Sequence, residues 1–544
     1  MAPENLRGLT RREFMWLAAA AAGSLALEWT APGTLAAKAN KDRPVVVIGG
    51  GLAGLCAAAH LARSGFPVTL VEQHDKPGGY ATTFDRAGGK YVFDVSLHST
   101  AGVRGGLRPS LEGAGVLDKI ESVELPEVAR IITPDYDMTW PQRDPESIVE
   151  MLTKTIPKEA QAFRGFFGEM MGILDEAMEP FDPDVWWHKM IFPFTHGKMW
   201  NIRKLTLADM LDKYTRDVKA RALLSTFWGY YGLPPSKLSA FYYCIATAAL
   251  LRFGSHIIKN RSQDLSDALA RAIEEAGGRI MFQKEAVGIS MDRDSITEVR
   301  LADGLTLKAA AVISNASAPA TMDMLPKGAA PEEYLRQLAS YRPSISSFNV
   351  WLGLNRNIRG DVKGYEIFVS RDYDPEKIYQ AALACNPYVS RMAVTICDNS
   401  FDGYSKPGTS TVTITMLSGY EPWRRFESDY FGGRKEEYRK EKERIANCLI
   451  DETERLVIPN LRSMIEVTEA STPLTNIRYT KNPEGAIYGY EQSLANSYMN
   501  RLPVRTPIKG LYFASAWSDP GGGYQPCLMS GVKAFREVVK DTPA

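Results

Sequence analysis

Residues 44–72 read PVVVIGGGLAGLCAAAHLARSGFPVTLVE. The unbroken β-branched run Val45–Ile48 predicts a strand that is buried on both faces. Three glycines follow in the spacing G-x-G-x-x-G, at Gly49, Gly51 and Gly54. Apolar residues then recur at helical spacing until Gly65, and a second apolar strand ends at Glu72. This order of strand, glycines, helix, strand and acid predicts a βαβ unit that binds a dinucleotide.

Each part of the predicted unit has a physical role. The first glycine permits a tight turn, the second lets a pyrophosphate approach the backbone, and the third lets helix and strand pack closely. The start of the helix, at Leu52 and Ala53, offers N–H groups and the positive end of a dipole to the phosphates. Glu72, followed by Gln73, can accept hydrogen bonds from a ribose hydroxyl and disfavours a 2′-phosphate. The pattern therefore favours FAD or NAD over NADP, although an ordinary glycine-rich turn is the alternative for such a motif alone.

Length and composition indicate a large protein of two or more domains. The chain has 544 residues, 45% of them hydrophobic, with 64 basic and 64 acidic side chains. This balance gives no electrostatic footprint for nucleic acid. The six cysteines are scattered without a C-x-x-C pair, and the histidines form no zinc motif, so we expect no metal and no iron–sulfur cluster.

Residues 1–39 resemble a twin-arginine export signal. The pair Arg11-Arg12 precedes a mild apolar run, Trp16–Leu27, and a small-x-small site at Ala37-Lys38-Ala39. The run is short for a membrane span. We therefore expect export in the folded state to the periplasm or another extracytoplasmic space, with membrane association as a further option. An uncleaved amphipathic helix or membrane anchor is the alternative.

A second glycine motif follows the first unit closely. The segment from Lys76 reads KPGGYATTF, and Tyr91–Asp94 reads YVFD. Two glycines let the backbone run close to a bound cofactor. Here the sequence resembles the FAD-dependent amine oxidase and phytoene desaturase superfamily, whose members carry this double glycine and a motif ending in Thr-Phe. Many members have arginine where this chain has Tyr80. That difference, with Leu97-His98 followed by Gly102, is more similar to the carotenoid isomerase and retinol saturase branch.

The C-terminal block resembles the closing FAD motif of the same superfamily. A buried strand, Gly510–Ala514, precedes the glycine run in Asp519–Gly523 and a helix that we expect from about Pro526. Glycines between a strand and a helix N-terminus let the backbone lie against a flat ring, and the helix dipole can stabilise negative charge there.

The middle of the chain alternates between nucleotide-domain and substrate-domain patterns. Residues 256–316 predict a helix, several strands and a hairpin, and the resemblance implies that Val287 lies beside the adenine. The aromatic segment Val185–Trp200 predicts either an apolar substrate entrance that touches a membrane or ordinary helical core. Thr472–Asn476 and Gly485–Gly489 resemble segments near the flavin and substrate cavity, with a turn and a buried strand end as the alternative.

These observations predict an α/β protein: a Rossmann-type FAD-binding domain assembled from discontinuous segments, with an interleaved α+β substrate domain. The expected FAD-binding segments are 40–130, 255–325 and 495–544. The expected substrate-domain segments are 131–254 and 326–494. No second G-x-G-x-x-G unit occurs, which argues against a separate nicotinamide domain.

The expected cofactor-binding residues are drawn from all of these motifs. They are Gly49, Gly51, Leu52, Ala53, Gly54, Glu72, Gln73, Gly78, Gly79, Tyr80, Thr82, Thr83, Val287, Asn315, Ala514, Asp519, Gly522, Gly523 and Gln525. The catalytic candidates are His98, as a proton-transfer group or a structural histidine, and Tyr488, as a residue lining the cavity.

The resemblance implies an FAD-dependent oxidoreductase acting on C–C bonds of an apolar polyene or isoprenoid-like substrate, by desaturation, saturation or isomerisation. Two alternatives remain: a flavin amine oxidase, and an exported flavin protein that passes electrons to a membrane redox partner. An exported enzyme has little access to NADPH, so we expect a quinone or another redox protein as electron partner, with peripheral membrane contact as a further possibility.

Overall fold

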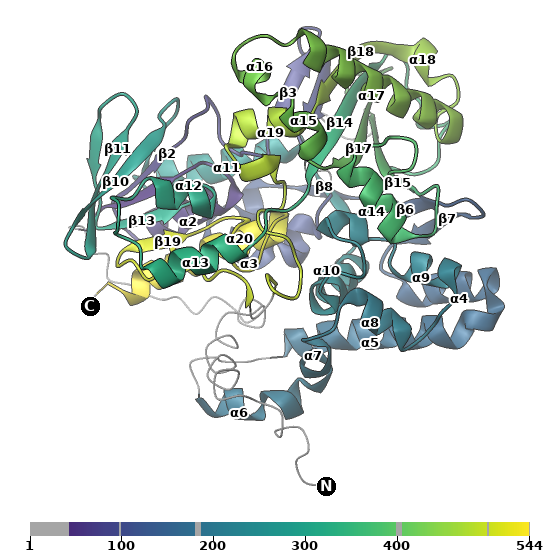
Figure 1. Cartoon of the computed structure of the whole chain (residues 1–544), viewed down its shortest axis with the longest axis horizontal. Helices are drawn as coiled ribbons and strands as arrows, with labels where there is room; N and C mark the ends of the chain where they lie inside the picture. The colour runs from purple at the N-terminus through teal and green to yellow at the C-terminus, as the bar shows by residue number, and fades with distance from the viewer. Residues whose placement is uncertain (1–42, 97–98, 180–185, 399–404, 498–499, 543–544) are drawn as a thin grey trace.

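The computed structural model describes residues 43–96, 99–179, 186–398, 405–497 and 500–542. Figure 1 shows a nucleotide-binding region, a second region built on a larger sheet, and a helical block beneath that sheet.

A five-stranded parallel sheet organises the first region. Its order is β19-β13-β1-β2-β9. Its strands are β1 (Val45–Ile48), β2 (Val68–Val71), β9 (Arg279–Met281), β13 (Ala311–Ser314) and β19 (Leu511–Phe513). The predicted strand–helix–strand unit is confirmed at its expected residues, with α2 (Leu52–Arg63) between β1 and β2. Strands from the start, middle and end of the chain therefore pair side by side, as a discontinuous Rossmann-type domain requires.

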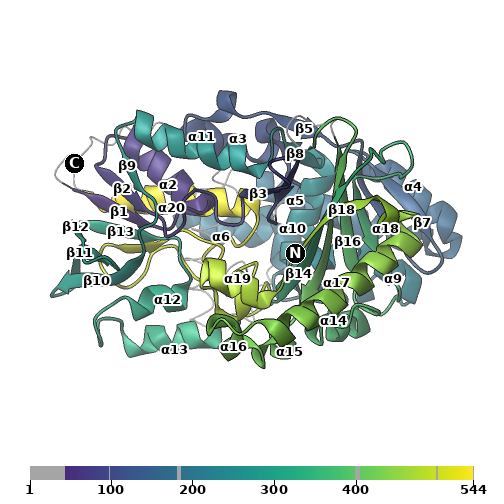
Figure 2. The ribbon, with the colours of Figure 1, turned by 90° about the horizontal axis from the view of Figure 1, so that it is seen from above.

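The two faces of this sheet carry different layers. α2, α11 (Ser262–Glu275) and α20 (Tyr524–Lys540) cover one face, where Val45, Val47 and Leu70 are buried. The sheet β10-β11-β12 covers the opposite face, where Val46 and Ile48 are buried. Its strands are Ala286–Asp292, Ser295–Leu301 and Thr306–Lys308. Figure 2 shows the helices and the sheet β10-β11-β12 on opposite sides of the parallel sheet. Successive residues of β1 point to opposite faces, so every side chain of its continuous apolar run is buried.

A seven-stranded mixed sheet forms the second region, in the order β18-β14-β17-β16-β15-β6-β7. Its strands are β6 (Glu127–Ile132), β7 (Asp137–Pro141), β14 (Ser346–Leu354), β15 (Glu366–Val369), β16 (Met392–Asp398), β17 (Ser410–Ser418) and β18 (Ile465–Ser471). The helix α17 (Glu436–Leu456) packs on one face of the sheet, on a core that includes Phe348 and Ile414. β6 spans the expected domain boundary after residue 130, and all of it belongs to this sheet.

The helical block packs against the opposite face of this sheet. Its main helices are α4 (Pro145–Thr155), α5 (Ala160–Met178), α7 (Gly197–Ile202), α8 (Leu207–Asp212), α9 (Val218–Leu224) and α10 (Ala240–Phe253). One hydrophobic core joins them to Phe368 of β15. α6 (Trp186–Thr195) lies at the far end of the block, away from both sheets (Figure 1).

Shorter elements complete the described chain. The strands are β3 (Thr83–Arg86), β4 (Tyr91–Asp94), β5 (Ser122–Glu124) and β8 (His256–Ile258). The helices are α3 (Arg108–Gly113), α12 (Ala318–Asp323), α13 (Glu332–Ser340), α14 (Pro375–Leu383), α15 (Glu421–Arg424), α16 (Glu427–Phe431), α18 (Leu461–Met464) and α19 (Pro473–Thr480), and the turns η3 (Gly102–Gly106), η4 (Leu117–Lys119), η5 (Pro157–Glu159), η6 (Trp228–Tyr231) and η7 (Pro483–Gly485). Within the described ranges, none of the helices combines the length and the apolar character needed to cross a membrane.

Candidate active site

A cavity of about 530 Å³ runs between the two regions. It begins at the carboxyl ends of β1 and β2, beside Ile48 and Val71, and reaches Leu174 on α5 and Ala249 on α10. The carboxyl end of a parallel sheet is the usual ligand position in this kind of fold. The cavity therefore extends from the predicted nucleotide loop to the helical block.

The first glycine loop is closely packed. A Cβ atom on Gly54 would lie 2.2 Å from the carbonyl oxygen of Gly49, and one on Gly51 would lie 2.5 Å from Asn315 Oδ1. Gly49 has a φ of +96°, in the region that favours glycine. Gly51 N–H donates to Asn315 Oδ1 over 3.1 Å. These glycines keep the backbone of the loop at the cavity wall, as the sequence pattern predicts.

Glu72 is held in place by two backbone donors. Its Oε2 accepts from Gly50 N–H at 2.6 Å, and its Oε1 accepts from His74 N–H at 2.9 Å. The carboxylate is buried and lines the cavity. Each carboxylate oxygen has further acceptor capacity, so the group can also receive a ribose hydroxyl.

The second glycine pair packs on the first loop. Gly78 N–H donates to the carbonyl of Gly50 over 2.7 Å, and a Cβ atom on Gly79 would lie 3.4 Å from the Cα of Gly51. Tyr80 follows them, and burial raises the pKa of its phenol, beside Thr480. This neutral side chain occupies the place where many members of the superfamily have a charged arginine.

The C-terminal block closes the same end of the cavity. Asn315 Nδ2 donates to the carbonyl of Ala514 over 2.5 Å, so one amide joins the first loop to the last strand. α20 begins after Gly523 without a side-chain cap, and Tyr524 and Gln525 in its first turn line the cavity. Its uncapped N–H groups provide a second helix N-terminus at this end of the cavity, besides that of α2.

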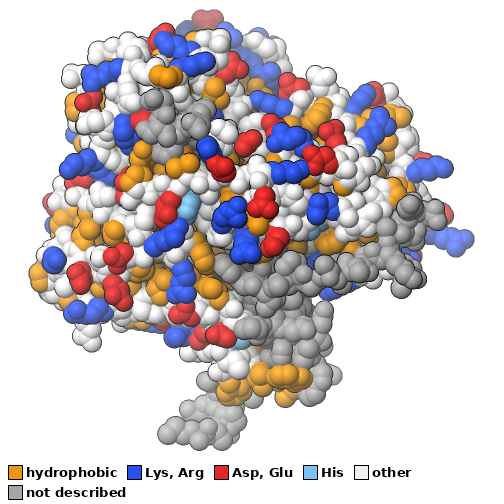
Figure 3. All heavy atoms as spheres, turned by 180° about the vertical axis from the view of Figure 1, so that it is seen from behind, with side chains coloured by type: hydrophobic (Ala, Val, Ile, Leu, Met, Phe, Trp, Pro, Cys, Tyr) orange, Lys and Arg blue, Asp and Glu red, His pale blue; other side chains and the backbone are white. Residues whose placement is uncertain are grey.

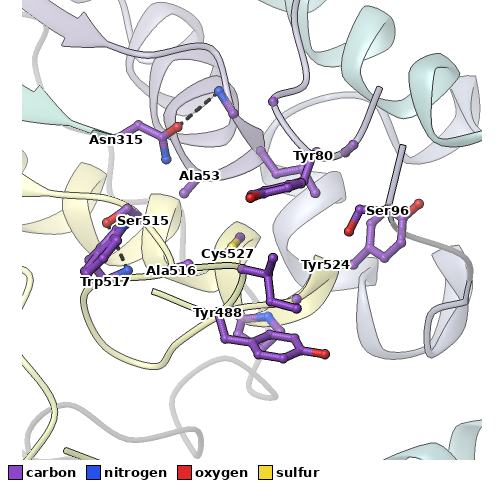
Figure 4. A pocket seen from close by; sticks show the side chains of 18 of the residues that line it. Ala53, Tyr80, Ser96, Asn315, Tyr488, Ser515, Ala516, Trp517, Tyr524 and Cys527 are labelled. Atoms are coloured by element: carbon purple, nitrogen blue, oxygen red, sulfur yellow. Dashed lines mark hydrogen bonds between the residues drawn. The ribbon is translucent and has the colours of Figure 1, made fainter. Parts of the chain in front are cut away.

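The far end of the cavity is an uncharged chamber. Its walls come from α5, η6, α10, β14, β17 and the segment after η7. The residues are Leu174, Ala177, Tyr230, Tyr231, Phe241, Tyr242, Ile245, Ala246, Ala249, Leu250, Ser347, Asn349, Thr415, Ile487 and Tyr488. Burial raises the pKa of Tyr242 to about 12, so its phenol stays neutral at physiological pH. Figure 4 shows Tyr488 and Tyr80 on opposite sides of the cavity.

Most of the predicted site residues line this one cavity. They are Gly49, Gly51, Leu52, Ala53, Glu72, Gln73, Gly78, Gly79, Tyr80, Asn315, Tyr488, Asp519, Gly522, Gly523 and Gln525. Five others do not reach its wall: Gly54, Thr82, Thr83, Val287 and Ala514. Gly54 packs against Gly49, and the carbonyl of Ala514 accepts a hydrogen bond from the Asn315 side chain. The side chain of Val287 is 37% exposed while its neighbour Ala286 lines the cavity. His98 lies outside the described residues.

Sequence reasoning missed most of the chamber. Tyr230 and Tyr242 line the chamber, and Ser96, Ser99 and Trp517 line the rest of the cavity, without belonging to any recognised motif. The one available signal for Tyr230 and Tyr242 is the high aromatic content of the helical segment, and it does not say which rings face inward.

The residues present fit a dinucleotide. Two uncapped helix N-termini and the glycine loops face the cavity, and in the described part of the chain Thr100 Oγ1 is a buried, cavity-lining hydroxyl without a hydrogen-bond partner. No group of three or more potential metal-ligating side chains occurs among the described residues. The fold and site together define a dinucleotide-dependent oxidoreductase with an uncharged chamber beyond the cofactor loops.

Comparison with known proteins narrows this class. The family model described as "Flavin containing amine oxidoreductase" matches residues 52–539. The chain belongs to this family, and it is an FAD-dependent oxidoreductase.

Several curated proteins are similar over nearly the whole chain. The all-trans-retinol 13,14-reductase of Danio rerio is 24% identical, over 88% of this chain and 83% of its own length. The hydroxyneurosporene desaturase of Rhodobacter capsulatus is 26% identical, over 92% of this chain and 99% of its own. The chloroplastic prolycopene isomerase of Daucus carota is 25% identical, over 92% and 81%. The resemblance seen in the sequence is therefore confirmed.

Solved structures share the fold. Putrescine oxidase bound to putrescine aligns with a TM-score of 0.61 at 15% identity, covering 92% of this chain and 98% of that one. An oxidoreductase of Methanosarcina mazei aligns with a TM-score of 0.59 at 16% identity, covering 92% and 100%.

Proposed function

We propose that this protein acts on C–C single or double bonds of an apolar polyene or isoprenoid-like substrate. The observation that carries the proposal is the uncharged chamber: the described lining residues of α5, η6, α10, β14 and β17 include no Lys, Arg, Asp or Glu. Polyenes are also what the retinol reductase, hydroxyneurosporene desaturase and prolycopene isomerase act on by their names.

When bound, FAD supplies hydride transfer, which serves desaturation and saturation alike. The protein's own residues have other tasks in this proposal. Asn315 fixes the glycine loops, whose backbone would contact the cofactor. Glu72 would accept a hydrogen bond from a ribose hydroxyl. The chamber orients the apolar substrate and excludes water from it.

The same chamber argues against an amine as the preferred substrate. A protonated amine that enters an apolar cavity is costly to bury unless a carboxylate or an aromatic cage receives it. The chamber has no carboxylate among its described lining residues, so only its aromatic rings could receive the cation. The observations favour a polyene over an amine.

The exposed apolar face of α6 suggests a membrane surface as the source of substrate. α6 carries four exposed apolar side chains, Trp187, Met190, Ile191 and Phe194. Their spacing of three and four residues places them on one face of the helix. Figure 3 shows hydrophobic side chains gathered on the segment that projects at the bottom of the molecule. We propose peripheral contact of this face with a bilayer, after twin-arginine export, and a quinone or redox protein as electron partner.

Anaerobic spectroscopy tests the proposed reaction. Oxidised and dithionite-reduced protein is mixed separately with all-trans-retinol, hydroxyneurosporene, prolycopene and putrescine, and the flavin absorbance and the extracted products are followed. Bleaching of oxidised flavin, reoxidation of reduced flavin, or a changed polyene isomer is the expected result with a polyene. Bleaching by putrescine together with no change in any polyene would overturn the proposal.

A further inference from the structure

A tyrosine and a carboxylate meet behind the wall of the uncharged chamber. Tyr230 of η6 donates a hydrogen bond from Oη to Glu366 Oε1 on β15. Ser99 Oγ donates to the other carboxylate oxygen, Oε2, over 3.3 Å. Tyr230 and Ser99 line the cavity, whereas Glu366 is only 3% exposed and lies behind them. The carboxylate therefore reaches the chamber through the hydroxyls that it accepts from.

The ring of Tyr230 is fixed by its neighbours. It stacks on Phe227 with the ring centroids 5.9 Å apart, and it meets the edge of Phe368 at 5.1 Å. Both phenylalanines belong to the core that joins the helical block to the large sheet. A phenol held in this way keeps one orientation without spending rotamer entropy when substrate binds.

The protonation state of Tyr230 suits proton exchange. Burial, and then the neighbouring Glu366, raise the pKa of Tyr230 well above its usual value, so the phenol stays protonated. Its one proton is directed at the carboxylate, and Ser99 is a second hydroxyl partner of Oη; a phenol oxygen accepts hydrogen bonds as well as donating one. The guanidinium of Arg391 lies 4.7 Å from the centre of the Phe368 ring and donates to the carbonyl of Thr226. Phe368 therefore packs against both Tyr230 and Arg391.

Two nearby tyrosines have hydrogen-bond partners that are not carboxylates. Tyr243 of α10 is more deeply buried, at 1% exposure, but its hydroxyl donates to the backbone carbonyl of Leu224 over 2.7 Å, and it does not line the cavity. Tyr231 also faces the cavity, but its hydroxyl pairs with Thr247 Oγ1 at 2.9 Å. Of these three tyrosines, Tyr230 combines a place in the cavity wall with a carboxylate partner.

We propose that Tyr230 is the proton-transfer residue of the reaction and that Glu366 positions it and exchanges its proton. This inference rests on the proposed function. In desaturation, oxidised FAD, when bound, would accept the two electrons of one C–H bond as a hydride. The neighbouring carbon loses its proton to Tyr230 Oη while the phenol proton passes to Glu366, and the C–H electron pair becomes the new double bond. Saturation runs the same transfers in reverse, from reduced flavin and protonated Glu366.

The test compares conservative variants in single turnover. Tyr230→Phe and Glu366→Gln each remove one member of the pair, Glu366→Asp retains a carboxylate, and Tyr243→Phe is the matched control that removes a buried hydroxyl away from the cavity. Each purified holoprotein is mixed anaerobically with the polyene that the wild type converts, in H₂O and in D₂O. The flavin spectrum and the half-saturating polyene concentration report whether the site is intact.

We expect Tyr230→Phe to slow the reaction about 100-fold or more, the usual scale of general acid–base catalysis, with the flavin spectrum and half-saturation unchanged. The solvent isotope effect of the wild type should disappear. Glu366→Gln should slow the reaction, Glu366→Asp should recover part of the rate, and Tyr243→Phe should stay near the wild-type rate. A Tyr230→Phe protein with the wild-type rate and isotope effect would overturn this inference alone. A wild type that converts none of the polyenes would overturn the proposed function, and the inference with it.

Discussion

A Cβ atom on Gly531 would lie 2.5 Å from the carbonyl oxygen of Ala53. The first residue belongs to α20 and the second to α2, so the closing and opening helices of the cofactor domain cross in backbone contact. Ala53 and the start of α20 both line the cavity. The contact therefore sets the distance between the two helix N-termini that face the cofactor.

Replacing Gly531 with alanine should separate these helices. Overpacking of this kind costs about 1–3 kcal/mol, and the shift should also weaken FAD retention. Urea unfolding and the flavin content after gel filtration measure the two effects. Gly168 of α5 is the control, because a Cβ atom there meets nothing within 4 Å. Gly168→Ala should stabilise the protein by up to about 1 kcal/mol. Equal unfolding free energies and equal flavin contents in the two variants would contradict the packing argument.

Asn315 should be as important for FAD affinity as the glycines. Its amide accepts from Gly51 and donates to the carbonyl of Ala514, so Asn315→Ala leaves two backbone polar groups, one of them at the cavity wall, without their partner. At about 1–3 kcal/mol for each buried group, we expect FAD to bind on the order of 100-fold more weakly. Fluorescence titration of the apoprotein measures this. Asn315→Asp keeps the acceptor for Gly51 and should lose less FAD affinity than Asn315→Ala. Weaker FAD binding by Asn315→Asp than by Asn315→Ala would refute this role of Asn315.

Stability should fall in mild acid because of His60. Its ring is buried on α2 beside Ser110, and burial lowers its pKa from 6.5 to about 4, with smaller contributions from Arg536 and Arg63. The folded state therefore binds fewer protons than the unfolded state between these pH values. Stability is retained above pH 6.5 and declines as the pH falls toward 4, by about 2 kcal/mol at pH 5.

His60→Gln retains a donor for Ser110 but cannot titrate. The free energy of unfolding of both proteins is measured in urea at pH 7 and at pH 5. Between these pH values the wild type should lose about 2 kcal/mol more than the variant. Parallel declines of the two proteins would show that other groups cause the acid sensitivity.

The exposed face of α6 should bind lipid. Trp187 and Phe194 are 48% and 63% exposed, and inserting them into a bilayer interface is favourable by about 1 kcal/mol or more each. We expect the double change Trp187→Ser and Phe194→Ser to reduce flotation with phosphatidylglycerol-containing vesicles at least 10-fold. Phe431→Ser removes a 52% exposed ring on α16 and should leave flotation unchanged. Vesicle binding that is equal in all three proteins would rule out this face.

Local sequence patterns were sufficient for the two ends of the cofactor domain. The bounds of β1, α2 and β2 agree with the prediction, because buried strands and glycine turns leave a signature within a few residues. The helix α20 begins at Tyr524 rather than at the expected Pro526, an offset of the size usual for helix ends. Asn315 was also identified, since it directly follows the predicted strand β13.

The chamber could not be predicted in the same way. Tyr230 and Tyr243 lie in similar aromatic sequence, yet one lines the cavity and the other is core. Glu366 lies in a short apolar strand with no motif around it, and it becomes notable only beside Tyr230, 136 residues earlier in the chain.

The sequence by itself therefore determined the cofactor class and the βαβ unit, because glycine spacing and a terminal acid act over a few neighbouring residues. Only the tertiary structure decided which side chains of the helical block and the large sheet face one chamber. That outcome depends on packing between segments distant in the chain, and no local pattern records which face of a helix or strand a distant partner will cover.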